Sequence, residues 1–303
     1  MTIARYLNLT DDNWDDKISA GMNMLEQCGL CPNSCNVNRV KVKHGFCKSG
    51  FFMKISSAFA HTGEEPPISG TKGSGTIFFS GCTMRCDYCQ NYPISQQNLG
   101  TEMPFSKVAD YMICLQNKGC HNINLVTPTH YIPQILIALR EAVGQGLSIP
   151  IVYNTSGYET PEGLRLMDGI VDIYLSDMRY AKNKTAEIYS HIKRYADYNR
   201  TALKEMSKQV GEMKFDNQGI AKSGLIVRLL ILPGLLDELR DNIKFLASQL
   251  PATPYISLMN QYFPTWKAIA QPQLNRSVTL SEFEQGISYL EQYGLDKGWI
   301  QHD

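Results

Sequence analysis

The chain has 303 residues, of which 43% are apolar and 19% charged, so it can fold around a full hydrophobic core. Its 29 basic and 29 acidic residues balance, which excludes the broad basic surface typical of nucleic-acid and anionic-membrane binders. No stretch reaches the roughly 20 apolar residues that span a bilayer, and the polar, acidic N-terminus lacks a signal-peptide pattern. We therefore expect a cytoplasmic protein without nucleic-acid or membrane partners.

The first 60 residues are predicted to form a helix and a cysteine-rich, metal-binding extension. Residues 1–27 begin with a polar stretch and continue into a short helix, WDDKISAGMNMLEQC. Residues 28–50 carry four cysteines among Pro, Asn and Gly, which favour turns. Residues 61–75, HTGEEPPISGTKGSG, are too rich in Gly and Pro for a helix or strand. We assign them as a connector that opens a second domain over residues 61–303.

Six short apolar runs follow, and each is predicted to be a β-strand: TIFFS (76–80), INLV (123–126), PIVYN (150–154), IVDIYLS (170–176), LIVRLLIL (225–232) and YISLM (255–259). Helical periodicity lies between most of them, at about 105–118, 131–145, 161–168, 184–213 and 236–249, and a last helix is predicted over 281–295.

Alternating strands and helices indicate parallel βαβ units. Six strands are too many for a small flavodoxin-like sheet and too few for a complete eight-fold barrel. A Rossmann sheet also has six strands, but no G-x-G-x-x-G follows the first one here. The prediction is an α/β fold built on a partial (β/α)6 TIM-type barrel.

Three cysteines follow the first strand, Cys82, Cys86 and Cys89 in GCTMRCDYCQNYPISQ. The chain has nine cysteines, an odd number with seven in two tight groups, which favours metal ligation over a disulfide framework. Closed zinc and ferredoxin-type sites have four protein ligands. Three thiolates can instead hold three irons of a [4Fe–4S] cube and leave the fourth iron open. The alternative is a zinc site completed by a distant Cys114, Cys120 or histidine.

Polar residues follow or lie within the other five strands, at the carboxyl ends where barrel enzymes place their chemistry. In strand order they are Thr127, Thr129 and His130; Asn154, Thr155 and Ser156; Asp177 and Arg179; Arg228; and Asn260, Gln261 and Tyr262. We expect these groups to gather at one rim.

The pattern C-x3-C-x-aromatic-C after the first strand resembles the signature of the radical S-adenosylmethionine (radical SAM) superfamily. Further segments resemble a subgroup labelled pyruvate formate-lyase-activating-enzyme-like: GEEPPISGTKGSGTIFFSGC, CQNYPISQ, HNINLVTPTHYIPQI, PIVYNTSGY, GIVDIYLSDMRYA and LIVRLLILPG. The resemblance runs from about residue 28 to the end of the chain.

The resemblance implies a specific chemistry. S-adenosylmethionine would bind the open iron through its methionyl amine and carboxylate. One electron from the cluster would cleave it to methionine and a 5′-deoxyadenosyl radical, which then abstracts hydrogen from a substrate. The protein would exclude water and aim the radical.

The resemblance also implies contacts to the cofactor from Tyr88 and Asn91 in the cysteine loop. Many superfamily members have Gly-Gly-Glu after the second strand, whereas this chain has VTPTHY. Thr127 and Thr129 could supply equivalent oxygens, or they could form the turn and cap the helix that starts near residue 131.

Two further turns resemble those of activating enzymes. NTSG at the end of the third strand resembles their Asp-Thr-Asn-Gly-like turn, which implies cofactor contacts from Asn154 and Ser156. SDMR after the fourth strand resembles their Asp-Leu-Lys, with Asp177 and Arg179 in matching places. An arginine can clamp a carboxylate, but the alternative is a structural ion pair between these two residues.

Arg228 lies within LIVRLLIL on the same face as Ile226 and Leu230. A buried guanidinium needs a carboxylate, either a core Asp or Glu or a ligand group in the barrel. The ligand carboxylate is the favoured prediction, and Arg228, His130 and Gln261 are assigned as catalytic. A lone histidine at a helix start can equally be a capping or core residue.

The first cysteine group is Cys28, Cys31, Cys35 and Cys47. Four close cysteines predict a closed site for zinc or for a second [4Fe–4S] cluster, with packing of four reduced thiols as the alternative. Zinc would be purely structural, whereas a cluster would relay electrons or contact substrate.

The sequence therefore predicts a radical SAM oxidoreductase that receives electrons from a flavodoxin or ferredoxin. One candidate substrate is a glycyl radical enzyme, and the alternative is a small molecule or peptide that is modified directly. A metal-stabilised binding protein without catalysis is the third reading, and the intact cysteine loop argues against it.

Overall fold

The computed structural model describes residues 4–41 and 44–301. Residues 1–3, 42–43 and 302–303 belong to the two predicted domains but lie outside the described residues. The strands are β1 (Met53–His61), β2 (Ser74–Phe79), β3 (Thr101–Met103), β4 (Ile123–Val126), β5 (Ile151–Thr155), β6 (Ile173–Asp177), β7 (Lys214–Phe215), β8 (Ala221–Leu230), β9 (Tyr255–Met259) and β10 (Gly298–Gln301).

The α-helices are α1 (Asp11–Glu26), α2 (Pro66–Ser69), α3 (Tyr92–Ser95), α4 (Phe105–Asn117), α5 (Ile132–Gly144), α6 (Pro161–Met167), α7 (Asn183–Ser190), α8 (Tyr195–Val210), α9 (Leu236–Gln249) and α10 (Leu280–Gln292). Three short 3-10 helices are η1 (Arg5–Asn8), η2 (Thr129–Tyr131) and η3 (Trp266–Ala270).

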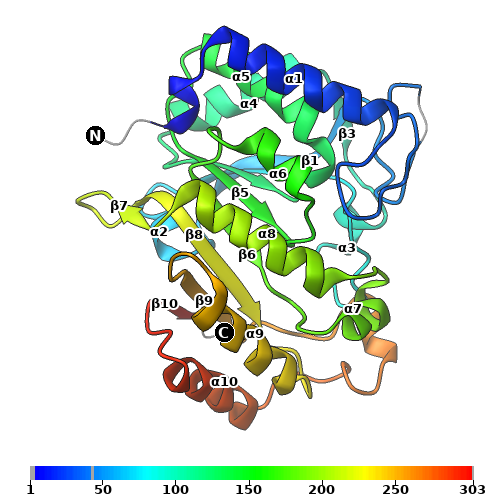
Figure 1. Cartoon of the computed structure of the whole chain (residues 1–303), viewed down its shortest axis with the longest axis vertical. Coiled ribbons are helices and arrows are strands. Elements are labelled where there is room, and N and C mark those ends of the chain that lie inside the picture. The colour runs from blue at the N-terminus through cyan, green and yellow to red at the C-terminus, as the bar shows by residue number, and fades with distance from the viewer. Residues whose placement is uncertain (1–3, 42–43, 302–303) are drawn as a thin grey trace.

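One sheet organises the molecule, in the order β10-β9-β8-β6-β5-β4-β2-β1-β3. The strands from β2 to β10 along this path pair in parallel, and β1 and β3 add an antiparallel edge beyond β2. The edge strands β3 and β10 are not neighbours in the sheet, so the barrel stays open. The predicted α/β fold with a partial barrel is confirmed (Figure 1).

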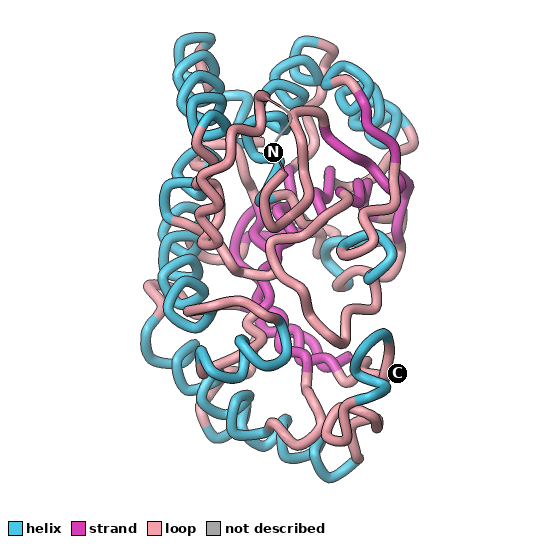
Figure 2. Tube along the Cα trace, turned by 90° about the vertical axis from the view of Figure 1, so that its right-hand side faces the viewer, coloured by secondary structure: helices cyan, strands magenta, loops and turns pink. Residues whose placement is uncertain are grey.

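Alternation along the strands explains the layers. Tyr153 and Val227 belong to the main core together with the apolar faces of the surrounding helices. Their neighbours Val152 and Ile226 face the other way and form a small inner core with Ile68 of α2. Figure 2 shows the strands in the middle of the molecule, with helices along one side and loops in front.

The N-terminal region departs from the predicted domain boundary. Strand β1 spans residue 60 and pairs antiparallel with β2, so the boundary falls inside one sheet. The predicted connector contains the end of β1, the turn of helix α2 and the start of β2. Helix α1 packs on α5 and α6. Its Thr10 caps the first turn by accepting a hydrogen bond from the Asn13 amide.

Two other segments differ from the prediction. The helix expected over residues 184–213 is two helices, because His191 and Arg194 adopt left-handed backbone conformations that end one helix before the next begins. After the last predicted helix the chain returns to the sheet as β10, beside β9. In the described part of the chain no helix is long and apolar enough to cross a membrane.

Candidate active site

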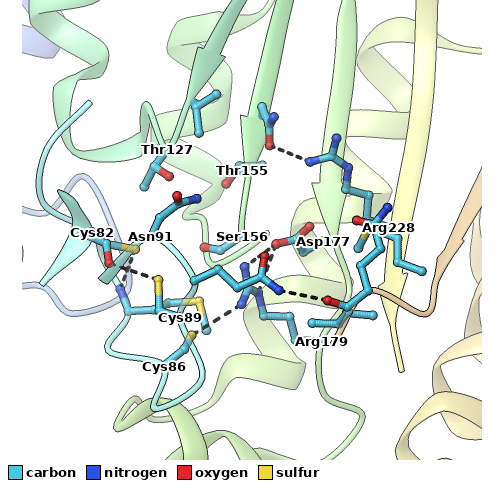
Figure 3. A pocket seen from close by; sticks show the side chains of 18 of the residues that line it. Cys82, Cys86, Cys89, Asn91, Thr127, Thr155, Ser156, Asp177, Arg179 and Arg228 are labelled. Carbon is cyan, nitrogen blue, oxygen red and sulfur yellow. Dashed lines mark hydrogen bonds and ion pairs between the residues drawn. The ribbon is translucent and has the colours of Figure 1, made fainter. Parts of the chain in front are cut away.

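The cysteine loop leaves the carboxyl end of β2 through Gly81, which has a φ of +84°. Cys82, Cys86 and Cys89 line one cavity of about 430 Å³ at the carboxyl ends of the parallel strands. Figure 3 shows the three cysteines on one side of this cavity and polar side chains at the carboxyl ends of β4, β5, β6 and β8 on the other. The structure thus brings the predicted loop and the predicted rim together.

One hydrogen-bonding group lies beside each of the sulfurs of Cys82 and Cys89. The Met84 amide donates to Cys82 Sγ at 3.4 Å, and the Ser95 hydroxyl lies 3.2 Å from Cys89 Sγ. Burial and the neighbouring thiols raise the pKa of Cys82 to about 12, so without metal this group is a neutral thiol. Binding of iron would convert the thiols to thiolates and release protons.

Cys86 has the most elaborate surroundings of the three. The Ser190 hydroxyl donates to its sulfur at 3.0 Å, and Arg179 Nη1 lies 3.6 Å from the same atom. Ser190 also contacts Tyr180, whose hydroxyl lies 2.7 Å from the hydroxyl of Tyr88. Such donors stabilise thiolates and tune the potential of iron–sulfur clusters. Three thiols at one cavity, each with polar support, fit a [4Fe–4S] cluster with an open iron.

The opposite wall contains most of the predicted cofactor residues. Thr127, Asn154 and Ser156 line the cavity from the ends of β4 and β5, and Asn91 lines it from the cysteine loop. Among the described residues the buried Ser156 Oγ has no hydrogen-bond partner. A buried hydroxyl without a partner is costly. Ser156 is therefore available to a polar ligand in the cavity.

Asp177 and Arg179 also line the cavity, and they are paired with each other. Arg179 Nη2 and Nε lie 2.5 and 3.0 Å from the same oxygen, Asp177 Oδ2. The structure contains the ion pair that the sequence offered as the alternative. Arg179 remains in contact with both Asp177 and Cys86, so it links the cysteine loop to β6.

Arg228 requires a correction. It lines the cavity, but its Nε and Nη2 bind Glu65 at 2.6 and 2.7 Å, and Nη2 also binds Glu64. Glu65 is fully buried. The favoured ligand carboxylate is therefore wrong, because the turn before α2 supplies two carboxylates to the guanidinium. Their charges raise the pKa of Arg228, although burial opposes this.

Thr129 and His130 also require correction, because neither lines the cavity. Thr129 donates to Glu159 Oε1 at 2.6 Å and caps no helix. His130 is buried and places Nε2 2.9 Å from the Ser80 carbonyl, so Nε2 carries the proton. Burial lowers the pKa of His130 to about 3. His130 therefore lies in the core and outside the cavity lining.

Gln261 and Tyr88 lie at the cavity as predicted. The side chain of Gln261 donates to Gln301 Oε1 at 2.9 Å, so strand β10 supports this residue. Tyr88 packs its ring edge to face against Tyr262, with centroids 6.0 Å apart.

Sequence reasoning missed several cavity residues. His61 and Glu64 reach the cavity from the segment assigned as a connector, and Gln301 reaches it from the unpredicted strand β10. The signal that could have found Glu64 is the need of Arg228 for a carboxylate partner, since two glutamates stand side by side in the connector.

The N-terminal cysteines lie in a separate loop. Cys28, Cys31 and Cys47 are buried and Cys35 is half-buried, and all four are free thiols. The Phe46 amide donates to Cys35 Sγ at 3.3 Å. Whether these residues bind a metal stays a prediction at this point.

Known proteins share this fold and motif. Residues 76–246 match the family model of the Radical SAM superfamily. An uncharacterized protein of Methanocaldococcus jannaschii is 31% identical over 292 residues, which cover 93% of this chain and 79% of that protein.

Two solved structures are similar in fold. HydG, a maturase of the [FeFe]-hydrogenase, has a TM-score of 0.51 and 13% identity, covering 98% of this chain and 59% of HydG. Streptococcus suis SuiB, solved bound to S-adenosylmethionine, has a TM-score of 0.50 and 11% identity, covering 73% of this chain and 48% of SuiB. At these identities the likeness concerns the fold alone.

The family match includes the cysteine loop and five of the parallel strands, β2, β4, β5, β6 and β8, whose carboxyl ends line most of the cavity. The relative extends the similarity over nearly the whole chain. The chain belongs to the radical SAM superfamily.

Proposed function

We propose that this radical SAM enzyme generates its radical at the cavity described above and directs it at a polypeptide substrate, such as a glycyl radical enzyme. When bound, the [4Fe–4S] cluster supplies the electron that cleaves S-adenosylmethionine to methionine and a hydrogen-abstracting 5′-deoxyadenosyl radical. The reductant would be a flavodoxin or ferredoxin. Nine free thiols suit the reducing cytoplasm, where we place the reaction.

The chain's own residues have separate tasks in this proposal. Cys82, Cys86 and Cys89 would hold three irons. Ser156 and Asn154 would accept or donate hydrogen bonds to S-adenosylmethionine from one wall. Arg179 would hold Cys86 in place and offer positive charge beside the cluster.

Cavity size is the observation that favours a polypeptide substrate. A cavity of about 430 Å³ lies near the lower end of the range that encloses one drug-sized ligand, roughly 300–1,000 Å³. S-adenosylmethionine is itself such a ligand, so it would occupy most of this space. The hydrogen donor must then reach in from the cavity mouth, as an extended peptide segment can. A small substrate buried beside S-adenosylmethionine is the competing reading.

The radical chemistry is tested directly. The protein is purified without oxygen, loaded with iron and sulfide, reduced with dithionite and assayed for 5′-deoxyadenosine. We expect cleavage by the wild type and by Cys114→Ser, whose exposed thiol lies outside both cysteine groups. We expect none from the triple variant Cys82→Ala/Cys86→Ala/Cys89→Ala. Cleavage by the triple variant would contradict the site assignment.

The substrate class needs a second assay. Extract of the source organism is separated without oxygen into macromolecular and small-molecule fractions, and each is added to the loaded enzyme. We expect the macromolecular fraction to yield a protein-based carbon radical in the electron paramagnetic resonance (EPR) spectrum. Stimulation of cleavage by the small-molecule fraction alone would favour direct modification of a metabolite.

A further inference from the structure

Backbone hydrogen bonds bring together parts of the segment that carries Cys28, Cys31, Cys35 and Cys47. The Cys28 amide donates to the Val37 carbonyl, and the Asn36 amide donates back to the Cys28 carbonyl, each at 3.0 Å. These bonds tie Cys28 to the two residues that follow Cys35. A Cβ added to Gly45, two residues before Cys47, would lie 2.8 Å from Cys35 Sγ, so this part of the chain also approaches Cys35.

Polar groups point at two of these sulfurs, as they do at the sulfurs of Cys82, Cys86 and Cys89. The Phe46 amide lies 3.3 Å from Cys35 Sγ, and Asn33 Nδ2 lies 3.7 Å from Cys31 Sγ. Cysteines that merely pack in a core are surrounded by apolar atoms. Donors aimed at sulfur instead match the outer shell of thiolate ligands to a metal centre.

The segment that carries Cys28, Cys31, Cys35 and Cys47 is in direct contact with the loop that carries Cys82, Cys86 and Cys89. Asn33 Nδ2, which approaches Cys31, also donates to the Thr83 carbonyl at 2.8 Å, one residue after Cys82. Gly81, the residue before Cys82, packs against the backbone of Cys47. A Cβ added to Gly81 would lie only 2.5 Å from the Cys47 carbonyl oxygen.

Arg85, in the loop with Cys82, Cys86 and Cys89, makes a further contact with the N-terminal cysteine segment. Its Nη2 donates to the Phe46 carbonyl at 2.9 Å, and its guanidinium lies over the Phe46 ring at 4.4 Å. In Figure 1 residues 28–41 and 44–50 lie beside α3, which comes directly after Cys89.

The geometry of the thiols bears on which metal they would hold. One zinc ion needs four ligands converging at about 2.3 Å. Within residues 4–41 and 44–301, no three His, Cys, Asp or Glu side chains are placed to hold a single metal ion. The same holds for Cys82, Cys86 and Cys89, which belong to a family that binds a [4Fe–4S] cluster. In a [4Fe–4S] cluster each thiolate binds its own iron, so four cysteines supply all the protein ligands that a closed cluster needs.

We infer that Cys28, Cys31, Cys35 and Cys47 hold a second, fully ligated [4Fe–4S] cluster that passes electrons to the cluster at Cys82, Cys86 and Cys89. The relay rests on the proposed function, whereas the second cluster stands without it. A one-electron protein donor reduces the second cluster by one electron. That electron then moves to the first cluster across the contact of Asn33 with Thr83, and the second cluster returns to its oxidised state. Cys35 is the half-buried member of this group, whereas the other three cysteines are buried.

Metal content tests the second cluster independently of activity. Cys82→Ala/Cys86→Ala/Cys89→Ala is loaded with iron and sulfide, and iron, sulfide and zinc are measured. We expect about four irons and four sulfides per chain, and an EPR signal of a reduced [4Fe–4S] cluster after dithionite. Wild type and Cys114→Ser should each hold about eight irons. Less than one iron per chain in the triple variant, or zinc as its metal, would overturn the assignment.

The relay is tested with donors of two sizes. Cys28→Ser/Cys31→Ser/Cys35→Ser/Cys47→Ser keeps the first cluster, and Cys35→Ser alone serves if the quadruple variant does not fold. With a flavodoxin as donor, we expect S-adenosylmethionine cleavage to fall at least about tenfold. With dithionite, a small ion that enters the cavity, cleavage should stay within about twofold of the wild type. Equal rates with both donors, or equal losses, would refute the relay. A loaded wild type that fails with dithionite would refute the proposed function and leave the metal count standing.

Discussion

Arg179 shows how one residue connects the ion pair, the cysteine loop and the expected redox chemistry. Its guanidinium contacts Asp177 Oδ2 and Cys86 Sγ. Reduction of a cluster adds negative charge, and a cation held a few ångströms away stabilises that charge in a buried site. The pKa of Arg179 is raised because Asp177 and Cys86 lie beside it, so the cation persists at every physiological pH.

Arg179→Gln should therefore lower the midpoint potential of the cluster at Cys82, Cys86 and Cys89. We expect a change of roughly 60 mV, which for one electron equals about a tenfold shift in the reduction equilibrium. An EPR-monitored redox titration measures it. Arg179→Lys keeps the charge and should retain most of the potential, and the exposed Arg165→Gln should leave it unchanged. An unaltered potential in Arg179→Gln would contradict this role.

Glu159 makes the stability of the protein depend on pH. It is buried and accepts hydrogen bonds from Thr129, Thr155 and Tyr153, yet burial raises its pKa from 4.5 to about 7. Between pH 4.5 and 7 the unfolded chain loses this proton while the folded chain keeps it, so the free energy of unfolding falls as pH rises. The loss amounts to about 3 kcal/mol when complete.

Glu159→Gln should remove that loss, and its free energy of unfolding should change less between pH 4.5 and 7 than that of the wild type. Urea denaturation at a series of pH values tests this, with the exposed Glu162→Gln on the neighbouring helix α6 as the matched control. If the free energy of unfolding of the wild type rises from pH 4.5 to 7, and Glu159→Gln gives the same pH dependence, the Glu159 carboxyl is ionised in the folded protein.

At the scale of elements, the turn between β2 and the cysteine loop determines how closely the two cysteine loops pack. Gly81 and Gly146 both have positive φ angles, +84° and +96°. A Cβ on Gly81 would meet the Cys47 carbonyl, whereas a Cβ on Gly146 meets nothing within 4 Å. Comparing substitutions at Gly81 and Gly146 therefore separates the cost of backbone strain, which both share, from the cost of the clash with Cys47, which only Gly81 has.

Gly146→Ala should cost about 1–2 kcal/mol of unfolding free energy from the left-handed backbone alone. Gly81→Ala carries the same strain plus a clash with backbone, and it should cost more and reduce the iron bound after loading. Chemical denaturation and iron analysis of the two variants check this. Equal effects of both substitutions would mean that the loops do not constrain each other.

For the whole molecule, cofactor binding and folding stability should be coupled. A ligand that binds only the folded state stabilises it by about 2.7 kcal/mol at a concentration of 100 times its Kd. S-adenosylmethionine should therefore raise the melting temperature of the iron-loaded protein. It should raise that of Cys82→Ala/Cys86→Ala/Cys89→Ala far less, because the open iron is missing. Thermal melts without oxygen measure both, and equal stabilisation would place the ligand away from the cysteine loop.

The open barrel itself could be predicted because its signals are local. Buried parallel strands are continuous apolar runs, so INLV and YISLM match β4 and β9 residue for residue. The antiparallel strand β1 and the late strand β10 escaped prediction. Their burial is mixed, and pairing with strands elsewhere in the chain, β2 and β3 for β1 and β9 for β10, holds them in the sheet.

By itself, the sequence determined the superfamily, the parallel barrel and the three thiols at its rim, because spacing and apolar periodicity are written along the chain. The tertiary structure decided the partners. In the folded chain Arg228 pairs with Glu64 and Glu65, and Thr129 and His130 are buried in the core. Asn33 and Phe46 contact the loop that carries Cys82, Cys86 and Cys89. These contacts join residues that are far apart in the chain. A local sequence pattern cannot predict them, because the partner of each side chain is determined only when the strands pack around the cavity.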